Sequence, residues 1–221
     1  MRYGLMSWGL AAFALMGCAG DGAAPPDGAF VDVAVDGAFT DIEEPATAEE
    51  ISEAAVSETL DVVSGHAPFP YTADQIRDAM PEGFWWTTRL EIVGRGVQTT
   101  RSVVTKATAE AVWFDTHVVN AKGEITGDPR SENATWVALR NHATFPSEFT
   151  TVTEGDIQVG EHELTCKVYL VTQERDGVPV RDRFYFATSK PGAPVVYDSY
   201  VNEKLAFRMT TIDWGNASES R

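Results

Sequence analysis

The chain has 221 residues and a formal net charge of −16, so its composition does not favour nucleic acid as a partner. Residues 19–66 contain 12 acidic side chains and neither Lys nor Arg, whereas residues 67–221 contain 21 acidic and 16 basic side chains. The negative charge therefore lies mainly in the first part of the chain. The nearly balanced remainder is long enough to bury the core of one domain.

The chain begins with the pattern of an export signal. Met1 and Arg2 give it a positive start, and the uncharged run from Leu5 to Met16 is apolar. At about 12 residues, this run is shorter than the roughly 20 apolar residues that a membrane-spanning helix needs. The pattern therefore predicts export across a membrane rather than a helix that stays within it.

The apolar run ends in Leu15-Met16-Gly17-Cys18, which resembles the lipobox of bacterial lipoproteins. The resemblance implies that residues 1–17 are a signal peptide and that acyl chains, such as palmitate, anchor Cys18 to a membrane. Ala19 rather than Asp follows the cysteine, which implies the outer membrane, with the domain facing the periplasm or the cell surface. The alternative is an ordinary secretory signal, cleaved a few residues later to leave a soluble periplasmic or secreted protein.

Residues 18–66 are expected to form a disordered acidic tether. The first part of this segment is rich in Gly, Ala, Pro and Asp, and it repeats a short pattern at Asp27–Val33 and Asp36–Ile42. Anionic lipid headgroups repel such a segment, so the tether would hold the folded part of the chain away from the membrane.

Residues 67–221 are expected to form one β-rich globular domain. Thr72 and Gln75 have the spacing of a capping box and predict a helix from Ala73 to Met80. A second short helix is expected over residues 135–142. Alternating apolar and polar residues, bounded by turn signals, predict strands at 84–92, 97–107, 112–118, 149–153, 156–159, 163–172, 178–188, 195–201 and 205–211. This order of elements predicts an α+β fold with one large, curved, half-barrel-like antiparallel sheet and two short helices.

Three segments near the C-terminus resemble a hairpin pattern of uncharacterised bacterial secreted proteins. They are Gly160–Cys166, Arg183–Ala187 and Pro191–Val195. Those proteins are similar to the lipoprotein-carrier superfamily, in which a half-open β-barrel closes over a helix and holds acyl chains. The resemblance implies a concave apolar sheet face that holds a lipid or another hydrophobic ligand.

The strand alternation places several large apolar side chains on one face of the predicted sheet. These candidate ligand-facing residues are Trp86, Leu90, Ile92, Phe114, Phe184, Phe186, Phe207 and Met209. They either pack against the two helices as an ordinary core or line a cavity in the curved sheet. Trp85 and Trp113 fall on the opposite face, where exposed aromatic rings would mark a surface for a protein partner.

Cysteine and histidine residues give little sign of catalysis. Cys166 falls on the apolar face of a predicted strand, so we expect a buried thiol, with a disulfide to Cys18 as the alternative. His162-Glu163-x-x-Cys166 superficially has metal-ligand spacing, but residues four apart in a strand are separated by about 13 Å. We therefore expect no metal site and no cofactor. Motifs of nucleophilic, phosphate-binding or dithiol chemistry are absent from the sequence.

These observations together predict a membrane-anchored, non-catalytic envelope lipoprotein that binds a lipid or another hydrophobic ligand in its concave sheet. An alternative is an interaction or structural lipoprotein whose partner is another envelope protein. An enzyme of unfamiliar type would need polar groups that converge in a cleft from distant parts of the chain.

Overall fold

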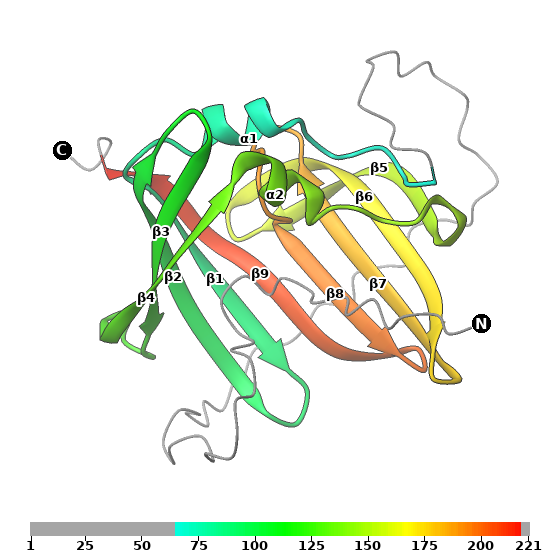
Figure 1. The fold of residues 1–221 in the computed structure, drawn as a ribbon. Coiled ribbons are helices and arrows are strands. Elements are labelled where there is room, and N and C mark those ends of the chain that lie inside the picture. Colours follow the sequence, from blue (N-terminus) through cyan, green and yellow to red (C-terminus); the bar gives the residue numbers. More distant parts are fainter. Residues whose placement is uncertain (1–64, 218–221) are drawn as a thin grey trace.

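A computed structural model describes residues 65–217 (Figure 1). The predicted signal peptide, Cys18 and nearly all of the predicted tether lie outside the described residues. The strands are β1 Phe84–Ile92, β2 Gly96–Ala107, β3 Ala111–Val119, β4 Ile125–Thr135, β5 Thr150–Val159, β6 His162–Arg175, β7 Val178–Ala187, β8 Val196–Val201 and β9 Lys204–Asn216. The helices are α1 Ala73–Ala79, α2 Trp136–Asn141 and the short 3-10 helix η1 Ser147–Phe149.

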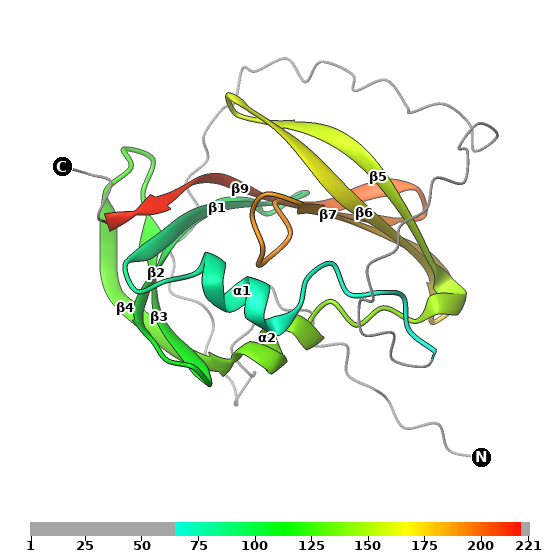
Figure 2. The ribbon, with the colours of Figure 1, turned by 90° about the horizontal axis from the view of Figure 1, so that it is seen from above.

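The nine strands form one antiparallel sheet in the order β4-β3-β2-β1-β9-β8-β7-β6-β5. All neighbours in the sheet are also neighbours in the chain except β1 and β9, which join two meanders at the centre. The sheet is curved and open, with α1 and α2 on its concave side (Figure 2). The predicted fold class, a large curved antiparallel sheet with two short α-helices, is confirmed.

The predicted capping box starts α1. The backbone N–H of Gln75 donates to Oγ1 of Thr72 at 3.1 Å, and the N–H of Thr72 donates to Oε1 of Gln75 at 2.8 Å. The helix ends at Ala79, one residue earlier than predicted. Pro81 follows Met80, and a proline disfavours helical geometry at the residue before it.

The strand β4 was not predicted from the sequence, because Gly127, Asp128 and Pro129 have the composition of a loop. It is an edge strand that pairs with β3 alone, and most of its side chains are exposed. These three residues lie where the register with β3 shifts. Pro129, which has no N–H to donate, therefore weakens the hydrogen bonding between β4 and β3 only slightly. Another difference is that β5 runs unbroken through Gly155, where two separate strands were expected.

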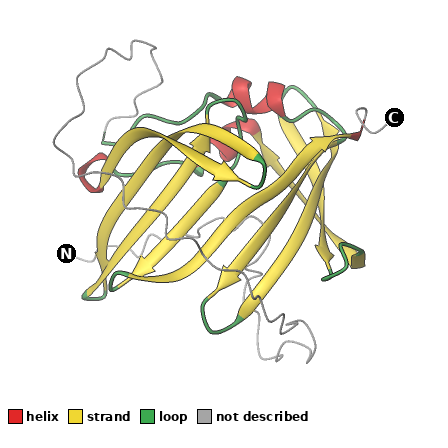
Figure 3. Ribbon diagram, turned by 180° about the vertical axis from the view of Figure 1, so that it is seen from behind, coloured by secondary structure: helices red, strands yellow, loops and turns green. Residues whose placement is uncertain are grey.

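The hydrophobic core has two parts, one on each side of the sheet. The main part lies between the concave face and the helices and includes Ile76, Trp136 and Phe145. The smaller part lies on the opposite, convex side, where the end of the β5–β6 hairpin crosses other strands (Figures 2 and 3). Its members are Val159, Leu164, Cys166, Ala187, Val195 and Val196.

Cys166 is completely buried, as the strand pattern predicted. Burial, reinforced by the nearby Asp156 carboxylate, raises the pKa of its thiol to about 11. The thiol is therefore protonated at neutral pH, and it lies in the smaller part of the core, away from the concave face.

Candidate ligand cavity

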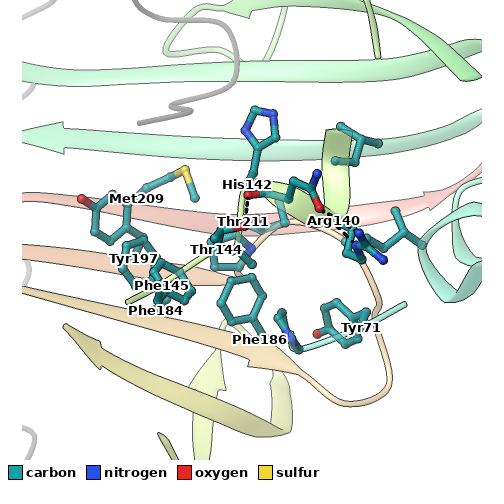
Figure 4. A pocket seen from close by; sticks show the side chains of 18 of the residues that line it. Tyr71, Arg140, His142, Thr144, Phe145, Phe184, Phe186, Tyr197, Met209 and Thr211 are labelled. Carbon is teal, nitrogen blue, oxygen red and sulfur yellow. Dashed lines mark hydrogen bonds between the residues drawn. The ribbon is translucent and has the colours of Figure 1, made fainter. Parts of the chain in front are cut away.

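A cavity of about 820 Å³ lies between the concave face of the sheet and the segments that carry the helices (Figure 4). Two segments, residues 66–80 and residues 136–146, form a layer that we call the cover. Cavity-lining side chains come from the cover, from seven strands of the sheet and from the loop at residues 192–194. The volume falls within the range of small-molecule sites.

Most of the side chains predicted to face a ligand do line this cavity. They are Trp86, Leu90, Phe114, Phe184, Phe186, Phe207 and Met209. Ile92, the last residue of β1, is not among the lining residues, although its partner Phe207 on β9 is. The two interpretations of this apolar stripe are compatible, since Phe114, Phe184 and Phe186 belong to the main core and also line the cavity.

Phe145 is a major wall residue that the sequence patterns do not reveal. It lies in the loop between α2 and η1, and its side chain is buried. Its ring centroid lies 4.7 Å from that of Phe184 and 5.3 Å from that of Tyr169. Because an irregular loop has no period, strand or helix patterns cannot show that such a side chain points inward.

Aromatic side chains attach the cover to the sheet through hydrogen bonds. The hydroxyl of Tyr71 donates to the carbonyl of Ala187 at 2.6 Å, and the hydroxyl of Tyr169 donates to the carbonyl of Pro68 at 2.7 Å. Burial raises the pKa of both tyrosines, so both remain protonated donors.

On the same concave face, toward the other end of the strand order, Nε1 of Trp136 donates to the carbonyl of Thr108, which follows β2, at 2.9 Å. The two segments of the cover are also joined to each other, since the N–H of Ala67 donates to the carbonyl of Phe145 at 2.8 Å. The cover is therefore held at both sides of the concave face, and the cavity lies beneath it.

One corner of the cavity carries a buried carboxylate. Asp182 is 2% exposed and accepts hydrogen bonds from Oγ of Ser199 at 2.6 Å and from the hydroxyl of Tyr197 at 3.2 Å. Its second oxygen accepts from Nη2 of Arg175 at 2.8 Å. Both carboxylate oxygens therefore have partners within the protein, and Asp182 acts as a structural part of the wall.

Trp85 and Trp113 do not line the cavity. The guanidinium of Arg101 lies 4.7 Å from the ring centroid of Trp85, and Nζ of Lys106 lies 4.8 Å from that of Trp113. These cation–π contacts cover part of each half-buried ring. The role of the two tryptophans as a partner surface stays a prediction.

The predicted strand assignment of His162 and Cys166 is confirmed, since both lie in β6. The ring of His162 lies 4.7 Å from that of Trp214. Within residues 65–217, no group of three His, Cys, Asp or Glu side chains is arranged to hold a metal ion. In the same part of the chain, no helix is long and apolar enough to cross a membrane.

Comparisons with known proteins leave the family open. No family model matches the chain, and no curated protein matches its sequence. Among solved structures, the fold is similar to MucB in the crystal structure of MucB in complex with MucA(peri), with a TM-score of 0.43 and 15% identity. The match covers 65% of this chain and 54% of the MucB chain, so this chain spans about half of that protein.

Proposed function

We propose that the domain binds a hydrophobic or amphipathic small molecule in the cavity beneath the cover. The observation that carries the proposal is a cavity of about 820 Å³ with a predominantly apolar surface, which includes eight aromatic side chains. The cover above this cavity is attached to the sheet at both ends. Protein interiors are close-packed and contain few voids larger than a water molecule. Filling apolar space of this size with a ligand removes apolar surface from water, which is favourable by about 25 cal/mol per Å².

The chemistry of the walls supports binding rather than catalysis. Asp182, the buried carboxylate at the cavity, already accepts hydrogen bonds on both oxygens. The protonated thiol of Cys166 belongs to the smaller part of the core and does not line the cavity. A non-catalytic binding protein therefore fits these side chains best.

Titration of the full chain with N-phenyl-1-naphthylamine, an uncharged dye that fluoresces in apolar surroundings, tests this proposal. We expect saturable binding, displacement of the dye by methyl laurate, and weaker binding in the Leu90→Trp and Met209→Trp variants, whose indoles enter the cavity. Ile212→Trp is the matched control, because Ile212 is exposed and does not line the cavity. Absence of saturable binding, or equal binding by all variants, would refute the proposal and favour a protein-interaction role.

We also propose that the domain is tethered to an envelope membrane through acylated Cys18. The support is the Leu15-Met16-Gly17-Cys18 pattern at the end of an apolar run. Cys18→Ser should move the protein from the membrane fraction to the soluble fraction, whereas Cys166→Ser should leave it with the membranes. If the Cys18→Ser protein still sediments with membranes, the anchor assignment is wrong.

A further inference from the structure

Three threonines form a row across the sheet at the cavity wall. Thr88 of β1 pairs directly with Thr100 of β2 on one side and with Thr211 of β9 on the other. All three line the cavity. Directly paired residues of neighbouring strands project from the same face, with Cβ atoms about 4.5–5.5 Å apart. The sheet therefore presents three adjacent hydroxyls to one region of the cavity, and we call this set the threonine row.

The threonine row differs from the neighbouring polar pair on the same face. Oγ of Ser102 and Oγ1 of Thr116 lie 2.8 Å apart and form a hydrogen bond with each other. Within the described part of the chain, the hydroxyls of Thr88, Thr100 and Thr211 make no hydrogen bond to another residue. A hydroxyl that is removed from water without a partner costs about 1–3 kcal/mol. These hydroxyls are therefore suited to a hydrogen-bond acceptor that a ligand brings into the cavity.

Apolar side chains lie on both sides of the threonine row. Along β1, Trp86 precedes Thr88 and Leu90 follows it, and all three side chains line the cavity. The row itself contains hydroxyls and no cationic group. Two arginines line other parts of the cavity, and both already have partners within the protein: Arg175 donates to Asp182, and Arg140 donates to Asn141. Carboxylates and phosphates are bound most strongly by charged donors, whereas a hydroxyl suits an uncharged carbonyl oxygen. The wall therefore matches a ligand with an uncharged acceptor between two apolar parts.

We propose that the threonine row is a subsite for the ester or amide carbonyl of a neutral acyl ligand. This inference rests on the proposed binding function, and it adds which chemical group the cavity selects. Thr100 and Thr211 lie two strand spacings, about 10 Å, apart, and a carbonyl oxygen has two lone pairs, so two adjacent hydroxyls of the row donate to it at a time. The apolar residues on either side of the row contact the acyl chain and the remainder of the molecule.

Dye displacement from the full chain by three probes tests the subsite. The probes are methyl laurate, an alkane of the same length, and the laurate anion. We expect wild-type protein to bind methyl laurate more tightly than either of the other two. The triple variant Thr88→Val, Thr100→Val, Thr211→Val keeps the shape of the wall and removes the hydroxyls. It should lose the preference for the ester over the alkane, by about five-fold for each hydrogen bond lost.

The double variant Thr99→Val, Thr210→Val is the matched control. Thr99 and Thr210 both pair with Arg89, on the same strands as the threonine row, and neither lines the cavity. It should retain the wild-type preference for the ester. The inference is overturned if the triple variant still prefers the ester to the alkane, or if wild-type protein prefers laurate to its ester. If neither the dye nor any probe binds wild-type protein, the proposed function itself fails, which is a distinct result.

Discussion

Replacing Leu90 with Trp is expected to leave the free energy of unfolding nearly unchanged, whereas replacing Val104 with Phe should lower it. Leu90 lines the cavity, and one indole occupies only a small part of about 820 Å³. Val104 is 1% exposed and belongs to the main core, but it does not line the cavity. A larger side chain there must displace packed neighbours, which costs about 1–3 kcal/mol.

Urea unfolding of the two variants and of wild-type protein measures their free energies of unfolding, and thermal unfolding measures their melting temperatures. For a domain of this size, each kcal/mol lowers the melting temperature by about 2–4 °C, so Val104→Phe should lower it by about 2–12 °C. Leu90→Trp should change the free energy of unfolding by less than about 1 kcal/mol. If Leu90→Trp destabilises as strongly as Val104→Phe, the side chain faces packed core, and the cavity is not available to a ligand.

Three further predictions concern stability. Tyr71→Phe removes one of the two donors to the carbonyl of Ala187, which keeps only the N–H of Lys190 at 3.0 Å, and should lower the free energy of unfolding in urea by about 0.5–1.5 kcal/mol; no change would contradict the role of this bond. Asp198→Asn removes the carboxylate that accepts two hydrogen bonds from Arg208, at 2.7 and 2.8 Å, and should cost about 3 kcal/mol by the same assay; a loss below about 1 kcal/mol would argue against it. Burial raises the pKa of Cys166 from 9.0 to about 11 in the folded state, so its contribution to stability is complete below pH 9 and is lost as pH rises through about 11. Cys166→Ala should lack this part of the pH dependence, and identical pH profiles for the two proteins would refute it.

Local signals in the sequence were sufficient for several elements. The Thr72–Gln75 capping box starts α1, because both of its hydrogen bonds join residues three positions apart. The turn at Asp176 and Gly177 connects β6 to β7 with positive φ angles of 55° and 79°, the conformation that Asp-Gly favours. The alternation in β1 correctly placed Trp86 and Leu90 on the cavity side. In each case, a few neighbouring residues contain all the information that is needed.

Features that depend on distant residues could not be predicted in this way. The pairing of β1 with β9 joins residues more than a hundred positions apart, and the threonine row exists only because of that pairing. β4 is stabilised as an edge strand by its partner β3, despite Pro129 in its own sequence. Phe145 lines the cavity because its loop packs onto the sheet, and no period marks a loop residue as buried.

Binding of methyl laurate to the full chain, followed by NMR of side-chain methyl groups, tests the central claim most directly. The methyl signals of Leu90 and Met209, which line the cavity, should shift in a saturable manner as the ester is added. Those of Val104 in the packed core and of exposed Ile212 should change little. Shifts that are absent, or that are equally large at all four residues, would contradict a ligand site beneath the cover.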